Sequence, residues 1–306
     1  MNAVILGYGV VGKGIEILAK TLDDINIKYV YVRKEKENLP YFSNNEDMVV
    51  QDDIDIVFEC LNGLEPANTL IQKALKKGKH VISSNKAVVP TYLDTYLELE
   101  EEYGGSIQVE ACVAGGIPFI DALLKLKRLE PLQGYEGIFN GTSNYILDSM
   151  QKNNLDFEDV LKEAQDKGYA EKDPSNDIDG VDVYYKTKIS NSLAFNTPIV
   201  DIPYYAGIRT IKMLDIKFIK MNNKVIRHLS ISRQIGNKII SIIAPCCMDE
   251  NDFLANVPSN YNAQKILSHS FDTLGYYGQG AGQLPTAQAM VQNALDTLEN
   301  KERKIV

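Results

Sequence analysis

The first third of the chain alternates short apolar runs with amphipathic segments. Short continuous apolar runs are typical of buried parallel strands, and apolar residues at helical spacing predict helices. The expected strands are Ala3–Leu6, Ile27–Val32, Ile54–Glu59, His80–Lys86 and Ile107–Ala111, and the expected helices are Lys13–Ala19, Ala67–Lys76 and Leu93–Tyr103. This alternation predicts an α/β fold with a doubly wound parallel sheet of the Rossmann type, which we assign to residues 1–112.

The pattern changes in the second part of the chain. Residues 225–233 and 238–245 are strand-like and flank the turn Gln234-Ile-Gly-Asn, which predicts a β-hairpin. A short helix over 156–167 should end at Gly168 in a left-handed C-cap. These elements predict an α+β domain with a mostly antiparallel sheet over residues 113–282.

Length and composition fit a soluble globular enzyme. A chain of 306 residues suggests about two domains. The net charge is −9 and no basic stripe appears, which argues against a nucleic-acid binder. Apolar stretches such as 239–245 are far shorter than the ~20 residues that span a bilayer, so no membrane association is expected. The N-terminus lacks the basic region of a signal peptide, and a cytoplasmic protein is expected.

Cysteine and histidine spacing does not favour a zinc site. The four cysteines show no Cys-x-x-Cys spacing, and the three histidines are scattered. The adjacent Cys246 and Cys247 are interpreted as buried reduced thiols in a strand rather than as a redox pair.

The glycines at positions 7, 9 and 12 form a Gly-x-Gly-x-x-Gly motif between the first strand and the first helix. Gly7 suits a tight turn, Gly9 a close approach to a pyrophosphate, and Gly12 close packing of helix and strand. The helix N-terminus then directs free N–H groups at the phosphates. An ordinary βα turn is the alternative, but the strand and helix context favours a dinucleotide site.

Charged residues after the second strand bear on the choice of cofactor. Arg33 and Lys34 offer cations where a ribose 2′-phosphate would lie, which favours NADP(H) over NAD(H). Glu35 could instead accept a hydrogen bond from a ribose hydroxyl.

Ligands of such sheets bind beyond the carboxyl ends of the strands. Residues 60–63, 83–86 and 110–116 should therefore border the nicotinamide end. Lys86 is either a surface lysine or a cation that anchors substrate. The turn Ala114–Pro118 could bind a monovalent cation through backbone oxygens, or could simply connect a strand to a helix. The polar loop Asn140–Asn144 could bind a carboxylate before the next helix.

The stretch 168–186 is rich in carboxylates. A helix is expected to begin after Asp179 as N-cap, which places Asp182 and Lys186 four residues apart on one face. Glu171, in the preceding loop, could fold back toward this pair. Two acids and an amine together could handle protons. The alternative is a solvated salt bridge worth about 0.3–0.5 kcal/mol.

Several separate segments resemble homoserine dehydrogenases, in the same order and over nearly the whole chain. They are Gly7–Gly12, Ser84–Lys86, Glu110–Pro118, Gly137–Leu147, Gly168–Lys186 and Gly280–Thr286. The chain is identified as a member of this family, in a short form without the C-terminal regulatory domain.

The resemblance implies an oxidoreductase that interconverts L-aspartate 4-semialdehyde and L-homoserine with NAD(P)(H), in threonine, methionine and isoleucine biosynthesis. It implies that 113–282 is a catalytic and dimerisation domain of a homodimer, and that the helix 283–306 packs back on the Rossmann domain. Lys186 would be the proton donor or acceptor, with Asp182 and Lys86 also catalytic. Glu171, Asp182 and Lys86 would bind substrate.

The resemblance also implies the ligand sets. The cofactor would contact Gly7, Gly9, Val10, Val11, Gly12, Arg33, Lys34, Ser84, Lys86 and Gly280, the last of which would close over the nicotinamide. A Na⁺ or K⁺ ion would bind main-chain atoms of Glu110, Val113, Gly115 and Ile117.

Three other classes of protein compete with this interpretation. Aspartate 4-semialdehyde dehydrogenase needs a nucleophilic cysteine with a basic partner, and neither Cys60 nor Cys112 has a histidine nearby in sequence. A dehydrogenase acting at the α-carbon of an amino acid would give no reason for Glu171, Asp182 and Lys186. A non-catalytic nucleotide-sensing protein would need only the glycine motif.

Overall fold

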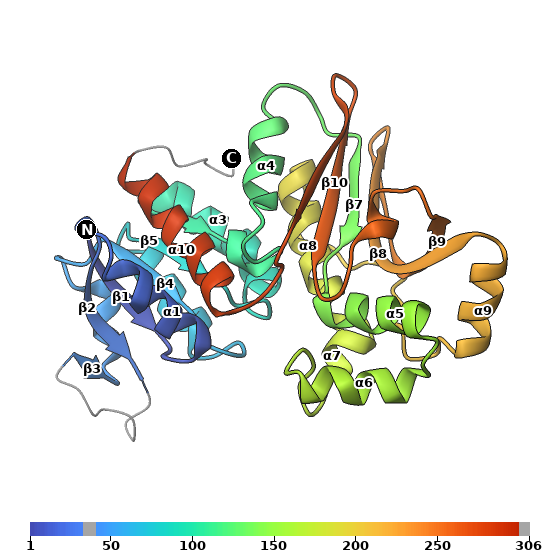
Figure 1. Cartoon of the computed structure of the whole chain (residues 1–306). Helices are drawn as coiled ribbons and strands as arrows, with labels where there is room; N and C mark the ends of the chain where they lie inside the picture. Colours follow the sequence, from blue (N-terminus) through green and yellow to red (C-terminus); the bar gives the residue numbers. More distant parts are fainter. Residues whose placement is uncertain (33–40, 300–306) are drawn as a thin grey trace. The chain divides into compact units, whose positions relative to one another are not determined.

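The computed structural model of the chain describes residues 1–32 and 41–299 (Figure 1). The chain divides into two compact units. Unit 1 comprises Met1–Leu124 and the C-terminal residues from Ala281, and unit 2 comprises Lys125–Gly280.

Unit 1 is built on a six-stranded sheet with the strand order β3-β2-β1-β4-β5-β6. The strands are β1 (Asn2–Leu6), β2 (Asn26–Tyr31), β3 (Phe42–Ser43), β4 (Ile56–Glu59), β5 (His80–Ser83) and β6 (Ser106–Gln108). All neighbouring strands are parallel. This is the strand order of a dinucleotide-binding sheet, so the predicted Rossmann-type fold is confirmed.

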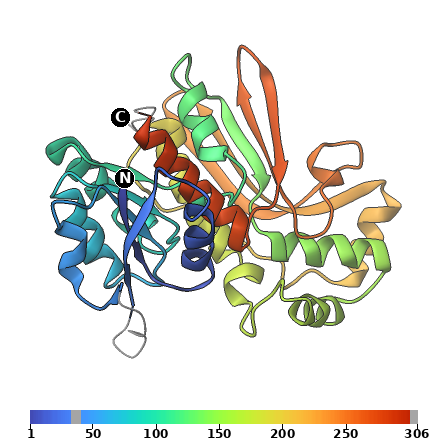
Figure 2. The same ribbon diagram turned by 60° about the vertical axis from the view of Figure 1, so that its left-hand side comes forward.

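Helices cover the sheet of unit 1. They are α1 (Val10–Ala19), α2 (Ala67–Leu75), α3 (Val89–Tyr103) and α10 (Gln283–Leu298), with 3₁₀ turns at Glu46–Val50 and Glu110–Cys112. Helix α4 (Phe119–Leu126) begins in unit 1, and the division between the units falls within it, after Leu124. The C-terminal helix α10 lies alongside α1 (Figure 2). A Cβ on Gly14 would come within 2.9 Å of Ala287, so glycine permits this close approach.

The division between the units falls later than the expected boundary at residue 112. Residues 113–124 belong to unit 1 because two contacts hold them there. The buried carboxylate of Glu110 accepts hydrogen bonds from the backbone N–H groups of Ile120 (3.0 Å) and Asp121 (2.6 Å) at the start of α4. Gly116 packs against Pro285 of α10.

Unit 2 contains a five-stranded sheet with the order β11-β10-β7-β8-β9. Its strands are β7 (Gly134–Ile138), β8 (Lys224–Ile235), β9 (Lys238–Asp249), β10 (Asn262–Ser268) and β11 (Asp272–Gly278). Every pairing is antiparallel, which confirms the second part of the fold prediction. Gly236, with φ 59°, makes the turn of the predicted hairpin.

The helices of unit 2 lie against this sheet and against one another. They are α5 (Gly141–Asn153), α6 (Phe157–Asp166), α7 (Ser175–Ile178), α8 (Val181–Phe195) and α9 (Met213–Met221), with a 3₁₀ turn at Leu254–Asn256. Apolar side chains from α5, α6, α7, α9 and β8 form one buried cluster. Gly168 adopts φ 73° after α6, as predicted.

Two local predictions in unit 2 were wrong. The N-cap of α8 is Gly180 in a left-handed conformation (φ 85°), whereas Asp179 pairs with Arg209 at 2.7 Å. Residues 141–144 form the first turn of α5 rather than a loop, because Asn140 caps that helix.

The prediction that Cys246 and Cys247 are buried was also wrong. Both lie on β9 and remain free thiols, but Cys246 is half-buried and Cys247 is exposed. Successive side chains of a strand point to opposite faces of the sheet, so Cys246 packs against the cluster around Leu229 and Leu254 whereas Cys247 faces solvent.

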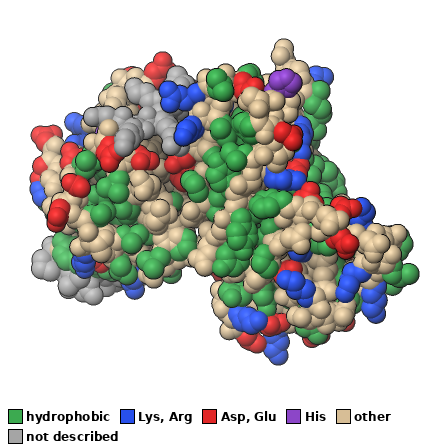
Figure 3. Space-filling view, turned by 45° about the horizontal axis from the view of Figure 1, so that its top comes forward, with side chains coloured by type: hydrophobic (Ala, Val, Ile, Leu, Met, Phe, Trp, Pro, Cys, Tyr) green, Lys and Arg blue, Asp and Glu red, His purple; other side chains and the backbone are tan. Residues whose placement is uncertain are grey.

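The surface carries mixed charge. On the face drawn in Figure 3, Lys and Arg side chains are interspersed with Asp and Glu and form no continuous basic stripe among the residues coloured by type. Within residues 1–32 and 41–299, no helix is both long and apolar enough to cross a membrane.

Candidate active site

Lys186 and Asp182 form an ion pair on α8 that is enclosed by the protein. Lys186 Nζ lies 2.8 Å from Asp182 Oδ2. Lys186 is 2% exposed and Asp182 is 9% exposed. The alternative of a solvated surface salt bridge is therefore wrong. A buried pair of this kind persists only where further hydrogen bonds satisfy both charges.

The second partner of the Lys186 ammonium is the carbonyl oxygen of Phe139, at 2.5 Å. Phe139 follows directly after β7, so this contact ties α8 to the end of the central strand of the sheet. The chain just before α8 is also held in place, because the Ile208 N–H donates to the carbonyl of Ile178, the last residue of α7, at 2.7 Å. A lysine that strand and helix hold together is oriented before any ligand binds.

Asn140 connects the acidic side chains of the site. Its Nδ2 donates to Asp177 Oδ1 at 2.7 Å and to Asp182 Oδ2 at 2.9 Å. Its Oδ1 accepts the backbone N–H of Ser143 at 2.8 Å and so caps α5. Burial, followed by the nearby charge of Asp182, raises the pKa of Asp177. The sequence predicted a polar loop at Asn140 but not this bridge, although an asparagine before a helix is itself an N-cap signal.

Glu171 lies exposed in the loop between α6 and α7. Its carbonyl oxygen accepts a hydrogen bond from Gln165 Nε2 at 3.0 Å. The hydrogen bonds that join Lys186, Asp182, Asp177 and Asn140 do not include the Glu171 carboxylate. Its role as a substrate ligand stays a prediction.

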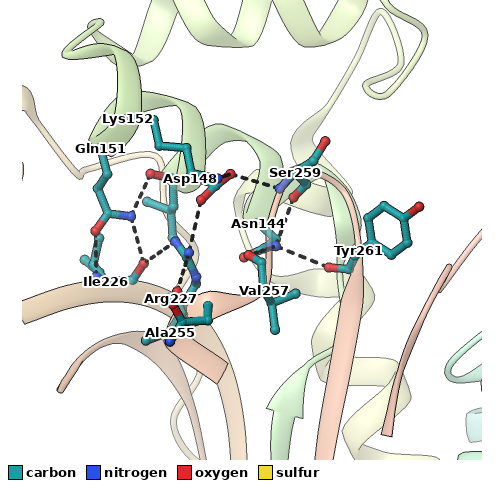
Figure 4. A network of polar contacts seen from close by, with 12 residues as sticks. Asn144, Asp148, Gln151, Lys152, Ile226, Arg227, Ala255, Val257, Ser259 and Tyr261 are labelled. Carbon is teal, nitrogen blue, oxygen red and sulfur yellow. Dashed lines mark hydrogen bonds and ion pairs between the residues drawn. The ribbon is translucent and has the colours of Figure 1, made fainter. Parts of the chain in front are cut away.

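A buried polar network fixes α5 behind the site (Figure 4). The Asp148 carboxylate accepts hydrogen bonds from Arg227 Nη2 at 3.1 Å and from the Ser259 N–H at 2.9 Å. Asn144 donates to the carbonyl oxygens of Ser259 (2.9 Å) and Tyr261 (3.2 Å). The amide of Asn144 thus holds the chain segment before β10. Helix α5, whose N-cap is Asn140, is therefore tied to the sheet.

His228, on β8, is a buried residue near the same helix terminus that sequence reasoning left unassigned. Its Nε2 lies 2.9 Å from the carbonyl oxygen of Ala206, and its Nδ1 lies 3.3 Å from Ser143 Oγ. Burial lowers the pKa of His228 to about 4, so the imidazole is neutral at physiological pH. A neutral ring suits it for holding the 206–208 segment rather than for proton transfer.

Unit 1 carries the glycine motif in the conformation that a dinucleotide requires. Gly7 has φ 93°, and a Cβ on Gly12 would overlap the Gly7 carbonyl oxygen. A Cβ on Gly9 would meet nothing within 4 Å, so the space beside it is open. Gly9 is the N-cap of α1 and no side chain caps that helix, which leaves the first N–H groups for a ligand. These features fit a bound pyrophosphate.

The other predicted cofactor residues fall in three places. Val10, largely exposed, and Val11, half-buried, begin α1. Ser84 and Lys86 are half-buried in the turn after β5. Arg33 and Lys34 lie outside the described residues. In unit 2, a Cβ on Gly280 would overlap the Asn262 amide, so this position has no room for a side chain.

The predicted cation ligands surround a tight turn in unit 1. Gly115 has φ 58°, and the carbonyl oxygens of Glu110 and Ile117 each accept one backbone N–H, from Val113 (3.2 Å) and Phe119 (2.8 Å). A carbonyl oxygen has two lone pairs, so each retains one for an ion. Burial and then the charge of Asp121 raise the pKa of the Glu110 carboxyl to about 8. A nearby cation would favour its ionised form, and the donor set fits a monovalent ion.

Comparison with known proteins matches both units. The family model described as homoserine dehydrogenase matches residues 118–295, and the model described as homoserine dehydrogenase, NAD binding domain, matches residues 7–110. A homoserine dehydrogenase of Neisseria gonorrhoeae is 38% identical over 251 residues, which cover 82% of this chain and 58% of that protein. One from Synechocystis is 35% identical over 312 residues, which cover 95% of this chain and 72% of that protein.

Solved structures agree with the sequence relatives. The crystal structure of a homoserine dehydrogenase from Thiobacillus denitrificans superimposes with a TM-score of 0.92 at 34% identity. The match covers 99% of this chain and 74% of that one. The resemblance predicted from the sequence is confirmed, and the chain belongs to the homoserine dehydrogenase family.

Proposed function

We propose that this chain catalyses the NAD(P)H-dependent reduction of L-aspartate 4-semialdehyde to L-homoserine and the reverse oxidation, in the biosynthesis of threonine, methionine and isoleucine. The observation that carries the proposal is the buried pair of Lys186 and Asp182, oriented by Phe139 and Asn140, in a chain of this family. Burying a charged lysine costs desolvation free energy, which an apolar residue with a purely structural role would avoid.

The chemistry follows from the charge that develops on the substrate. When bound, the nicotinamide cofactor supplies the hydride to the carbonyl carbon. Negative charge then grows on the carbonyl oxygen, and the Lys186 ammonium stabilises it and gives up a proton. The carboxylate of Asp182 favours the ionised form of Lys186 and orients its ammonium group. The ammonium and carboxylate of the amino acid need opposite charges, for which Glu171 and Lys86 are the proposed ligands.

The assay that tests this function follows NADPH absorbance with L-aspartate 4-semialdehyde as substrate. Oxidation that depends on this aldehyde supports the proposal. No oxidation with it, but turnover with an α-keto acid and ammonia, would favour the dehydrogenase acting at the α-carbon. NADPH binding without turnover of either substrate would leave a nucleotide-binding protein.

We propose NADP(H) as the preferred cofactor, on the charges of Arg33 and Lys34. Replacing both by alanine should raise KM for NADPH by ~10-fold or more and change KM for NADH little, because only the former has a 2′-phosphate to pair. Steady-state kinetics with both cofactors measures this. An unchanged ratio of the two KM values would reject the assignment.

We also propose that the turn at Glu110, Val113, Gly115 and Ile117 holds Na⁺ or K⁺. Thermal unfolding in NaCl or KCl is compared with unfolding in tetramethylammonium chloride, whose cation is too large for main-chain ligation. Equal midpoints in all three salts would count against the site.

A homodimer is the proposed assembly, and the exposed face of β9 supports it. Ile240 is 56% exposed and Ile242 is 38% exposed. Both point away from α8, since the intervening Ser241 hydrogen-bonds to Asn191 of that helix at 2.9 Å. Exposed isoleucines on a sheet face mark a surface that another chain can cover. The four free thiols agree with a cytoplasmic setting for this assembly.

Charged residues on this face should dissociate the dimer. The double change Ile240→Lys and Ile242→Lys buries two ammonium groups in the proposed interface, so sedimentation should report a monomer where the unchanged chain is a dimer. Leu129→Lys is the matched control, because Leu129 is exposed but lies outside the sheet. A double variant that remains dimeric would place the interface elsewhere.

A further inference from the structure

Glu59 is a buried carboxylate to which the proposed chemistry gives no role. It is the last residue of β4 and is 0% exposed. Its Oε1 accepts hydrogen bonds from the Leu61 N–H at 2.8 Å and from Asn85 Nδ2 at 3.3 Å. Its Oε2 accepts the Ser83 hydroxyl at 2.5 Å. These three donors are uncharged, and enclosing a carboxylate among neutral groups is costly.

The partners of Glu59 extend into two turns at the carboxyl ends of neighbouring strands. Ser83 Oγ accepts the Asn85 N–H at 3.1 Å, and Asn85 Nδ2 also donates to the Gly63 carbonyl at 2.8 Å. Asn85 Oδ1 accepts the N–H groups of Ala87 and Val88, each at 3.1 Å, just before α3. One carboxylate therefore joins the turn after β4 to the turn after β5.

The second of these turns carries Ser84 and Lys86. Ser84 Oγ donates to the Glu59 carbonyl at 3.4 Å, so the backbone of Glu59 contacts the turn as well. A shift of the Glu59 carboxylate would therefore move Ser83 and Asn85, and with them the neighbouring residues Ser84 and Lys86. Ligands of a doubly wound sheet bind at this edge, where small displacements of contacting groups are costly.

The charge of Glu59 is also sensitive to pH. Burial raises its pKa to about 7, against the opposing effect of the hydrogen bonds from Ser83, Leu61 and Asn85. The charge of Glu59 acts on three titratable groups: the thiols of Cys60 and Cys112 and the hydroxyl of Tyr96. The pKa of each group is raised, mainly by burial and secondly by the charge of Glu59. The positive charge of Lys86 acts on Cys112 in the opposite sense.

We propose that Glu59 is a positioning residue for cofactor binding, which sets the geometry of the turn 83–88 through Ser83 and Asn85. The proposal rests on the proposed function, because it assumes that Ser84 and Lys86 contact the bound cofactor. As an ionised acceptor, Glu59 holds both donors at once. When protonated, it loses acceptor capacity and releases part of this constraint.

The test compares the unchanged chain with Glu59→Gln, which preserves size and removes the charge. Calorimetric titration with NADPH at about pH 6 and about pH 8.5 is the main measurement. In the unchanged chain, NADPH should bind more tightly at the higher pH than its own phosphate ionisation predicts, and a matched control that keeps Glu59 should show the same pH dependence. Glu98→Gln, an exposed change on α3, is that control. Glu59→Gln should bind ~10-fold more weakly at the higher pH and should lose the extra pH dependence.

A second measurement reports on Glu59 without any ligand. Its native pKa of about 7 lies above the ordinary value of 4.5, so between these values the native state binds more protons than the unfolded state. Stability from this group is therefore full below about pH 4.5 and is lost as the pH rises through about 7. The thermal midpoint should fall more between about pH 5 and about pH 8 in the unchanged chain than in Glu59→Gln.

The outcomes separate the possible failures. Weaker NADPH binding with the pH difference abolished supports positioning. A Glu59→Gln chain that keeps both the affinity and its pH dependence overturns it, as does an altered thermal midpoint with unchanged affinity, which would make Glu59 purely structural. If Glu59→Gln does not fold, Ser83→Ala removes one of the three hydrogen bonds and should weaken NADPH binding in the same direction. None of these readouts requires turnover of the aldehyde, so failure of the proposed reaction is distinguishable.

Discussion

Replacing Lys186 by methionine should lower kcat for the reduction of L-aspartate 4-semialdehyde by ~10²–10⁴-fold, the usual contribution of a general acid. Methionine keeps the length and apolar stem of the side chain but has no proton to give and no charge to place beside the growing oxyanion. Affinity for NADPH should change little, because the lysine acts on the substrate oxygen. Stopped-flow measurement of the hydride step, with calorimetry for NADPH, separates the two effects.

The obvious complication is folding, since the change leaves a buried aspartate without its cation. Breaking a buried ion pair costs about 3–5 kcal/mol. Asn140 still donates to Asp182 at 2.9 Å and moderates the loss. The double variant Lys186→Met, Asp182→Asn contains neither charge and should recover most of the stability while remaining inactive. Restored activity in this double variant would show that Lys186 does not transfer the proton.

Lys188→Met is the matched control for this experiment. Lys188 lies on the same helix and also pairs with an aspartate, Asp201, at 2.9 Å, but that partner is largely exposed. An exposed pair contributes about 0–1 kcal/mol, so its loss should affect neither folding nor kcat by more than a small factor. An equal loss of activity in both variants would indicate disruption of α8 rather than of chemistry.

The architecture was predictable because it depends on patterns that are local in sequence. Alternating apolar runs and helices, read with the glycine motif, lead to a parallel sheet of one handedness and one strand order. The hairpin 225–245 was equally visible, because alternation and a glycine turn specify it. The same local information misplaced the start of α8, where Gly180 adopts a positive φ that allows the chain to turn before the helix.

The sequence predicted which residues form the site, but it did not predict that they are buried. The spacing of Asp182 and Lys186 puts them on one helix face, yet it cannot reveal whether that face meets water or protein. The ammonium is enclosed in part by the carbonyl oxygen of Phe139, which lies 47 residues earlier in the chain and accepts its hydrogen bond. Glu59 was not predicted for the same reason. Its partner Ser83 ends the neighbouring strand β5 and its partner Asn85 lies in the turn that follows, so only the pairing of β4 with β5 brings them together.

Alanine at Gly9 and alanine at Gly12 should impair the dinucleotide site by different routes. At Gly9, φ is −86°, which an L-residue adopts freely, and a Cβ there meets nothing within 4 Å. Gly9→Ala should therefore fold with nearly unchanged stability, losing a few tenths of a kcal/mol or somewhat more at an N-cap. Its methyl group occupies the space that a pyrophosphate would approach, so Kd for NADPH should rise by ~10²-fold, or about 2.7 kcal/mol.

At Gly12 the new methyl group would overlap the carbonyl oxygen of Gly7, a backbone atom that cannot move without opening the turn. Overpacking of this kind typically costs 1–3 kcal/mol, so Gly12→Ala should lower the thermal midpoint as well as abolish tight NADPH binding. Gly14→Ala separates packing from binding, because its methyl group would press on Gln283 and Ala287 of α10 instead. It should lower the midpoint and leave NADPH affinity nearly intact.

Thermal unfolding without ligand and calorimetric titration with NADPH on all three variants give six values that must fit one pattern. Gly9→Ala should lose affinity alone, Gly14→Ala stability alone, and Gly12→Ala both. Tight NADPH binding by Gly9→Ala would mean that the pyrophosphate does not approach the N-terminus of α1. A stable and tightly binding Gly12→Ala would contradict the contact between Gly7 and Gly12 on which the geometry of the turn depends.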